Sequence, residues 1–307
     1  MKVTTAANPA DRTTFIGASD TAAVLGMSPW RSPGDVYLEK SGRLEPRDTG
    51  NVATTRGNLL EPAVLAWAEA ELGTPITNRQ RFVTCPDHPH IAATLDGITG
   101  DALVEVKTSA KPSEWGDAGT DEIPDHYKLQ VQHQLRVAGA QLAYVPVLLA
   151  ASGIGFDFRM YRVERDDELA EYVVAEAARF WREHVQADVA PDNFEPSLDV
   201  AKRMRREPGK TVEMPDLAVA AYLQAQRRVK SANADLDRIK AELLVALDDG
   251  EAADTPAGHR VTYMEQTRKS LDAKAIERDH PEPAARYRRQ SAYRVLRVKA
   301  GKDIGDE

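Results

Sequence analysis

Three charged side chains between residues 91 and 108 have the types and spacing of a metal-dependent hydrolytic site. Asp96 ends the run IAATLD directly before a glycine, and Glu105 and Lys107 follow in LVEVKT. Successive side chains of a strand point to opposite faces, so Glu105 and Lys107 are expected to share one face. If the two runs pair as a hairpin through ITGDA, Asp96 comes opposite Glu105. Two carboxylates and an ammonium would then meet in one small volume.

Two neighbouring carboxylates are unfavourable unless a cation neutralises them. Oxygen ligands select a hard cation, so the pattern predicts Mg²⁺ or Mn²⁺ rather than zinc. Such an ion polarises a phosphodiester and activates water. Lys107 can orient or deprotonate that water, or neutralise charge on the phosphorus oxygens. Glu61, in the helical run RGNLLEP, is a further candidate ligand.

Each of these residues has a simpler explanation when it is taken alone. An E-x-K run is common on exposed strand faces, and an aspartate before a glycine is ordinary turn chemistry. A glutamate near the start of a helix compensates the helix dipole. Their occurrence together and in this order favours a hydrolytic site.

The composition limits the kind of protein that carries this site. The chain has 307 residues, a net charge of −8 and 42% hydrophobic residues, which is typical of a soluble globular protein of one large or two ordinary domains. Its longest apolar stretch, 142–151, is too short for a membrane span, and its N-terminus lacks the apolar core of a signal peptide. The single cysteine, Cys85, excludes a disulfide framework. We therefore expect a soluble cytoplasmic protein.

Hydrophobic periodicity predicts the elements that position the charged residues. One helix is expected to end at Gly73 and another before Gly139, because glycine favours helix C-termini. The order α-β-β-β-α-β-β-α predicts an α/β fold with a mixed sheet flanked by helices. The predicted helices are 56–72, 125–137 and 169–185, and the predicted strands are 79–84, 91–95, 102–108, 142–149 and 156–163.

The C-terminal third has a different pattern. Beyond a proline-rich stretch, a helix runs to Asp249 with apolar residues spaced alternately by three and four. This seam predicts a helix that packs on its own domain or on a partner. A strand is expected at 259–264. The tail 268–302 has eleven Lys and Arg against four Asp and Glu, and it either contacts DNA or is a solvated face. The seam residues are Tyr222, Ala225, Val229, Ala232, Leu236, Ile239, Leu243 and Ala246.

Five segments resemble the YqaJ-type viral recombinase family, to which phage lambda exonuclease belongs, within the PD-(D/E)xK nuclease superfamily. They are IGASDTAAVLG, RGNLLEPAV, TLDGI, LVEVKT and YKLQVQHQL, and the resemblance spans 17–185. It implies a restriction-endonuclease-like PD-(D/E)xK core in a nuclease domain at 1–195. A linker at 196–214 and a C-terminal extension at 215–307 would follow, the extension comprising the long helix and a small basic module that contains β-structure.

The resemblance also assigns roles to the charged residues. Asp96 and Glu105 would be metal-binding carboxylates, and the backbone carbonyl of Val106 would be another ligand. Lys107 would be the catalytic lysine. Glu61 would be the helix-borne acid and a further metal ligand.

Further roles concern the wall of the site and the DNA end. Gln130 would belong to the active-site wall. In the family, an arginine and a serine hold the 5′-phosphate, and Ser19 of GASD matches that serine. Arg12 falls at the offset of the arginine, although its surroundings match the family less well. Thr94 stands where relatives carry a small hydroxyl residue, while Leu95 replaces the usual proline or small residue before the first aspartate.

The implied activity is Mg²⁺-dependent exonuclease digestion of linear double-stranded DNA, 5′ to 3′, which leaves 3′ overhangs for a single-strand annealing protein. The family's rings of three subunits imply a homo-oligomer. An endonuclease or single-strand nuclease on the same core is an alternative, because the carboxylates do not encode polarity. A non-catalytic DNA-binding or scaffold protein is another, but the complete set of site residues argues against it.

Other polar and aromatic groups have plainer explanations. The run CPDHPH at 85–90 lacks a fourth zinc ligand at ordinary spacing, so a polar loop is favoured. His126 and His133 are expected to face DNA or solvent rather than to act as general bases. Trp30 and Trp115 could stack on a frayed base, but packing is favoured for both.

Overall fold

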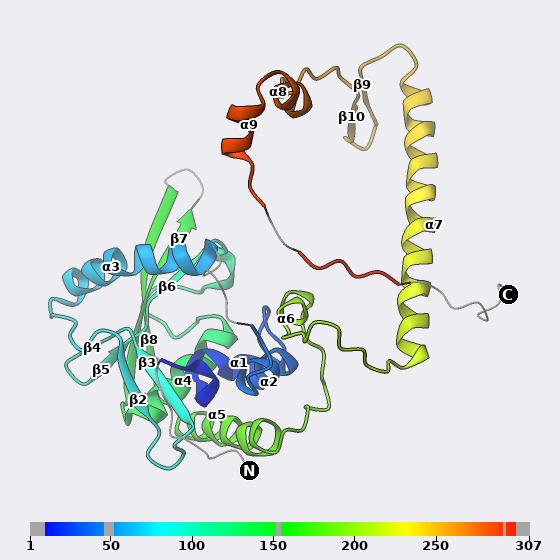
Figure 1. Ribbon diagram of the computed structural model, residues 1–307. Helices are drawn as coiled ribbons and strands as arrows, with labels where there is room; N and C mark the ends of the chain where they lie inside the picture. Colours follow the sequence, from blue (N-terminus) through cyan, green and yellow to red (C-terminus); the bar gives the residue numbers. More distant parts are fainter. Residues whose placement is uncertain (1–9, 46–51, 152–154, 291–292, 299–307) are drawn as a thin grey trace. The chain divides into compact units, whose positions relative to one another are not determined.

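The computed structural model describes residues 10–45, 52–151, 155–290 and 293–298, which fall into two compact units (Figure 1). Unit 1 is Met1–Pro208 and unit 2 is Gly209–Glu307. The boundary lies within the segment expected to be a linker. Part of that segment packs on unit 1: Val200 of helix α6 (Leu198–Lys202) is buried, and the Ser197 N–H donates to the Asp35 carboxylate at 2.7 Å.

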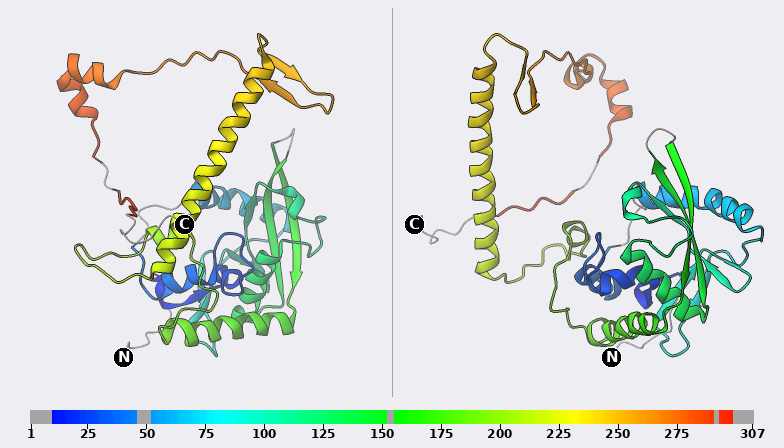
Figure 2. Two further views of the ribbon diagram at one scale, coloured as in Figure 1. Left: turned by 90° about the vertical axis from the view of Figure 1, so that its right-hand side faces the viewer. Right: turned by 180° about the vertical axis from the view of Figure 1, so that it is seen from behind.

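The strands of unit 1 form two sheets (Figure 2). In the smaller sheet, β3 lies between β1, which is parallel to it, and β2, which is antiparallel. In the larger sheet, β7 pairs in parallel with β5 and then β6, and antiparallel with β8, while β4 forms a hairpin with β5. Asp96 lies between β3 and β4, where the chain passes from one sheet to the other. The strands are β1 (Ile16–Gly17), β2 (Arg81–Thr84), β3 (Ile91–Leu95), β4 (Gly97–Thr99), β5 (Ala102–Val104), β6 (Lys107–Ser109), β7 (Leu142–Ala151) and β8 (Gly155–Glu164).

Helices cover both faces of the larger sheet. Leu103 belongs to the core cluster that contains Leu135 of α4, whereas Val104 belongs to the cluster that contains Leu65 of α3. Because neighbouring strand residues point to opposite faces, α4 and α3 cover opposite faces. The mixed sheet flanked by helices is therefore confirmed. The helices of unit 1 are η1 (Arg12–Thr14), η2 (Ala18–Asp20), α1 (Thr21–Val24), α2 (Pro33–Lys40), α3 (Val52–Leu72), η3 (Pro112–Glu114), α4 (Asp125–Ala138), α5 (Asp167–Phe180), the π-helical turn η4 (Trp181–Gln186) and α6.

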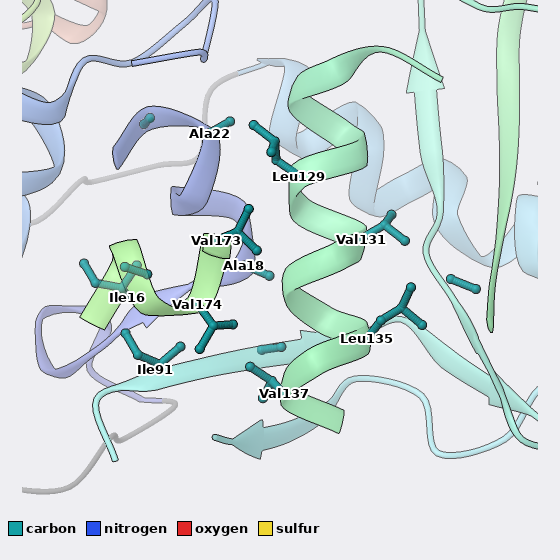
Figure 3. Packing of buried hydrophobic residues seen from close by; sticks show 14 of the residues in the cluster. Ile16, Ala18, Ala22, Ile91, Leu129, Val131, Leu135, Val137, Val173 and Val174 are labelled. Carbon is teal, nitrogen blue, oxygen red and sulfur yellow. The ribbon is translucent and has the colours of Figure 1, made fainter. Parts of the chain in front are cut away.

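Helix α4 is buried between the sheets and the N-terminal segment, and Figure 3 shows its apolar side chains pointing in several directions. Val131 and Leu135 are fully buried, and Ile16, Ile91 and Val174 pack into the same core. The helix ends as predicted at Gly139, whose φ of 69° is the left-handed conformation that glycine tolerates. A central helix of this kind can carry polar side chains into the interior.

His133 of α4 is one such side chain, and it is fully buried. Its Nδ1 lies 2.7 Å from the Thr21 hydroxyl and its Nε2 lies 3.2 Å from the Ala92 carbonyl. A carbonyl only accepts, so Nε2 carries the hydrogen and Thr21 donates to Nδ1. Burial lowers the pKa of His133 to about 4, so the ring is neutral at neutral pH. The expectation that His133 faces DNA or solvent is wrong, because it joins the N-terminal segment to β3.

Replacing His133 with leucine should lower the free energy of unfolding by about 2–4 kcal/mol. The Thr21 hydroxyl and the Ala92 carbonyl would each lose a buried partner. Urea denaturation followed by tryptophan fluorescence measures the change. The control is His259→Leu at an exposed position, where we expect a change within about 0.5 kcal/mol. Equal losses in the two variants would remove His133 from this structural role.

Unit 2 consists of a long helix followed by small elements. The seam predicted on α7 is exposed at Val229, Leu236, Ile239 and Leu243, so unit 2 itself does not cover it. Tyr287 in the basic tail is also exposed, and both explanations of that tail stand. In the described ranges, no helix is sufficiently long and apolar for a membrane span. The elements are α7 (Asp216–Leu247), the antiparallel pair β9 (Ala252–Asp254) and β10 (Arg260–Thr262), α8 (Ala273–Asp279) and α9 (Pro281–Tyr287).

Candidate active site

The three charged residues singled out in the sequence come together where the two sheets join. Pairing of β4 with β5 places Gly97 opposite Val104, so Asp96 and Glu105 are the next opposed positions. The Lys107 ammonium donates to the Glu105 carboxylate and lies 4.9 Å from the centre of the Tyr127 ring. The Glu105 and Lys107 side chains are only 5% and 13% exposed. The cluster is therefore largely shielded from bulk water.

Two glutamines of α4 hold Glu105 in place. Gln130 Nε2 donates to one carboxylate oxygen at 2.5 Å, and Gln134 Nε2 donates to the other at 2.6 Å. Gln130 Oε1 also accepts from the Lys107 ammonium at 3.3 Å. Gln130 thus contacts both Glu105 and Lys107, and its role in an active-site wall stays a prediction. Gln134 was not predicted, although its spacing of four residues from Gln130 puts it on the same helix face.

The electrostatics of the cluster are dominated by crowded carboxylates. Burial and the charges of Glu105 and Glu61 raise the pKa of Asp96 to about 8, although Lys107 and the Val106 N–H oppose this. Burial alone would lower the pKa of Lys107, but Glu105 and Asp96 raise it above its ordinary value. Lys107 is thus held as an ammonium, and it does not neutralise all the acidic groups around it.

The strand predicted at 102–108 is interrupted at Glu105 and Val106, and Pro146 of β7 explains the gap. The register is the same on both sides, with Val104 opposite Tyr144 and Lys107 opposite Val147. The Glu105 N–H donates to the Tyr144 carbonyl at 3.0 Å, so the Glu105 carbonyl would normally accept from residue 146. Proline has no N–H to donate. The prediction of one continuous strand is therefore wrong at this point.

The backbone of Val106 faces the opposite way, toward Asp96. Its N–H donates to the Asp96 carboxylate at 2.8 Å. The pairing of β4 with β5 has already ended at Gly97 and Val104, so the Asp96 side chain takes the place of a backbone acceptor. This bond places the Val106 backbone next to the Asp96 carboxylate. The role of the Val106 carbonyl as a metal ligand stays a prediction.

Glu61 reaches the site through a residue that sequence reasoning missed. Gln80 Nε2 donates to the Glu61 carboxylate at 2.7 Å and lies 3.4 Å from Asp96 Oδ1. Gln80 has a φ of 56°, in the left-handed region that non-glycine residues seldom adopt. Strained backbone of this kind is often kept at functional sites. A glutamine before a short strand gives no sequence signal for such a role.

The residues predicted to bind phosphate lie on β3 or on the N-terminal segment that pairs with it. Gly17 pairs in parallel with Ala92, and Ser19 of η2 and Thr94 of β3 each follow two positions later. Arg12 Nη2 lies 3.4 Å from the exposed Ser19 hydroxyl. The phosphate-binding role of this pair stays a prediction. Thr94 is also exposed, and its carbonyl accepts from Gln134 at 3.3 Å.

The remaining candidates are placed as follows. Trp115 is buried, as expected for packing. Trp30 remains 63% exposed beside the His126 ring at 4.7 Å, so the expectation that it is a packed side chain is wrong. In the run 85–90, Cys85 is buried and His90 Nδ1–H donates to the Thr14 carbonyl at 3.2 Å. The run forms the loop between β2 and β3.

The donor set at Asp96 suits a hard divalent cation. Asp96, Glu105 and the Val106 carbonyl offer only oxygen ligands, which Mg²⁺ and Mn²⁺ prefer. In the part of the chain that the structure describes, no three Asp, Glu, His or Cys side chains form a ready metal site. A cation here would therefore rely on the two carboxylates and the carbonyl, with Glu61 close enough through Gln80 to take part.

Comparison with known proteins finds a family resemblance in the N-terminal part of the chain. Residues 9–141 match the model of the YqaJ-like viral recombinase domain. This part of the chain is therefore similar to that domain. The matched residues include Asp96, Glu105, Lys107 and the other predicted site residues. A relative along almost the whole chain is the uncharacterized protein YqaJ of Bacillus subtilis strain 168, with 24% identity over 302 residues, 94% of this chain and 92% of that protein.

Solved structures similar to the chain include two exonucleases. An alkaline exonuclease (LHK-Exo) from Laribacter hongkongensis has a TM-score of 0.46 and 23% identity, covering 58% of this chain and 91% of that chain. A phage related exonuclease from Haemophilus somnus 129PT has a TM-score of 0.41 and 13% identity, covering 57% of this chain and 96% of that chain. Both matches leave about two fifths of this chain uncovered.

Proposed function

We propose that this protein is a metal-dependent deoxyribonuclease that digests linear double-stranded DNA from 5′ to 3′. Its products would be 3′ overhangs for homologous recombination through a single-strand annealing partner. The observation that carries the proposal is the convergence of Asp96, Glu105 and Lys107 beside Val106, whose N–H donates to Asp96. The match to a viral recombinase domain supports the recombination context. A homo-oligomer, by resemblance a ring of three subunits, is part of the proposal.

The side chains divide the work of hydrolysis between them. A Mg²⁺ or Mn²⁺ ion bound by Asp96, Glu105 and the Val106 carbonyl would polarise the phosphodiester and supply an activated water. The Lys107 ammonium, held by Glu105 and Gln130, would stabilise the charge that develops on the phosphate oxygens. Burial of this cluster strengthens each of these electrostatic interactions.

The preference for a 5′ end rests on Arg12 and Ser19. A guanidinium and a hydroxyl together supply the donors that a terminal phosphate accepts. β1, which lies between Arg12 and Ser19 in the chain, pairs with β3, which directly precedes Asp96. A phosphate held by this pair would therefore set the position of the DNA strand that enters the catalytic cluster. This arrangement favours an exonuclease over an endonuclease.

The decisive experiment is digestion of linear duplex DNA that carries a different label at each 5′ and 3′ end, beside a covalently closed circle. We expect Mg²⁺ to support release of the 5′ labels first, leave the circle intact and give no product with EDTA. Cleavage of the circle would assign an endonuclease instead. Failure to cut either DNA with Mg²⁺ or Mn²⁺ would leave a DNA-binding or scaffold protein with a nuclease fold.

A further inference from the structure

A buried carboxylate beneath the proposed phosphate site is paired with three cations. Asp20 lies 2.7 Å from Arg31, 2.8 Å from Lys40 and 3.3 Å from Arg12, measured between charged atoms. The side chains of Asp20 and Lys40 are both 0% exposed. Burial alone would raise the pKa of Asp20, but the three cations hold it well below its usual range. Asp20 is therefore charged, and its nearest partners are Arg31 and Lys40.

Lys40 also fixes the main chain that carries Arg12. Its ammonium donates to the Arg12 carbonyl at 2.8 Å. Lys40 is the last residue of α2, so this bond ties the N-terminal segment to that helix. The Arg12 side chain itself is 51% exposed and borders Ser19. Lys40 thus controls where Arg12 stands without being able to reach a ligand in solvent.

The charges of the cluster show why a buried lysine matters here. Arg31 is shared between Asp20 and Glu39, whose oxygen is 2.8 Å away, and Arg12 lies 3.8 Å from Glu39. The five side chains joined by these ion pairs comprise three cations and two carboxylates. Without Lys40, the two arginines would be balanced by the two carboxylates. Among these five side chains, one positive charge remains with Lys40, and Arg12 is the most exposed cation. The carboxylates of Asp11 and Asp35 act on Lys40 and Arg31 from outside this set.

We propose that Lys40 is a positioning residue of the phosphate site, because it neutralises Asp20 and so leaves the Arg12 guanidinium available to a phosphate. Glu39 acts in the opposite sense by drawing on the same arginines. This inference rests on the proposed function, which assigns Arg12 and Ser19 to the phosphate at a DNA end. The addition to the proposed function is that the buried Lys40 sets the net charge around Arg12 and Ser19.

The test is the ratio of affinities for 5′-phosphorylated and 5′-hydroxyl duplex ends, measured by fluorescence anisotropy with EDTA and therefore without cleavage. Lys40→Met should lower this ratio by about tenfold, comparable to Arg12→Ala and Ser19→Ala, because a charge-assisted hydrogen bond is lost. Glu39→Gln should raise the ratio by roughly threefold, since its carboxylate is partly exposed. The control, Lys202→Met, changes a lysine that is 65% exposed and should leave the ratio unchanged.

Two results would overturn the inference: an unchanged ratio in folded Lys40→Met, or no rise in Glu39→Gln. If Lys40→Met does not fold, as judged by circular dichroism, Glu39→Gln alone decides, because it introduces no unpaired buried charge. A wild-type protein that cleaves DNA but shows no phosphate preference would refute this inference and keep the nuclease. A phosphate preference that needs Lys40, without cleavage in Mg²⁺, would refute the nuclease and keep the inference.

Discussion

Lys107→Ala is expected to lower the rate of DNA hydrolysis by at least about 10²- to 10³-fold, the cost of removing one preorganised charge from a reaction centre. The ammonium that faces the reacting phosphate would be lost. Asp96, Glu105 and the Val106 carbonyl would stay in place, since Gln130 and Gln134 still hold Glu105. DNA binding should therefore change little. The rate is measured as nucleotide release from linear duplex at saturating Mg²⁺, and binding is measured by anisotropy.

The matched control is Lys111→Ala. Lys111 follows four positions later and is 70% exposed, paired with Glu114, so hydrolysis should remain within about twofold of wild type. Near-normal cleavage by Lys107→Ala would show that the catalytic charge is supplied elsewhere. A parallel loss of DNA binding would instead make Lys107 a binding residue.

Asp96→Asn is expected to stabilise the metal-free protein at pH 8 and to abolish its stabilisation by divalent metal. The pKa of Asp96 is about 8 in the folded chain, against about 4 when unfolded. A raised pKa means that the folded state keeps a proton which the unfolded state has released. This group's contribution to stability is therefore complete below about pH 4 and is lost as the pH rises toward 8. Asparagine does not ionise, so the variant should keep this stability as the pH rises.

Urea denaturation in EDTA at pH 5, 6.5 and 8 tests the prediction. The wild type should lose of the order of a few kcal/mol across this range through Asp96, and the variant should lose less. Adding Mg²⁺ should then stabilise the wild type but not Asp96→Asn, because ligand binding to the folded state adds to stability. Asp101→Asn, at an exposed position of the same hairpin, is the control. Identical pH profiles for all three proteins would contradict the crowding of carboxylates.

The sequence was sufficient for the parts of the site that depend on local periodicity. Alternation along a strand predicted that Glu105 and Lys107 share one face, and the two side chains are in contact. A two-strand hairpin predicted that Asp96 lies opposite Glu105, and the hairpin register ends one position before this pair. Glycine signals located the ends of α3 and α4 correctly. These features depend on residues within about ten positions of one another in the chain. They can therefore be predicted from the sequence without knowledge of the fold.

Features that depend on distant partners could not be predicted. Pro146 looked like an ordinary member of an apolar strand, because its effect on Glu105 depends on which strand lies beside it. Lys40 and Asp20 are of types that usually lie on the surface, and only the fold shows that they neutralise each other in the interior. The burial of His133 could not be predicted for the same reason, because its partner Thr21 is distant in the sequence. Gln80 acquires its role from an uncommon backbone conformation that its residue type does not suggest.

The parallel pairing of β1 with β3 has a consequence for the size of the products. A β-strand rises by a nearly constant ~3.3 Å per residue, and it can be neither stretched nor compressed appreciably. Thr94 lies in β3 and Asp96 follows the end of this strand, so their spacing is short and nearly constant. If the proposed phosphate site includes Thr94 and the proposed catalytic site includes Asp96, each cut would be measured from the DNA terminus and not from the base sequence. We then expect products of uniform length, whatever the DNA composition.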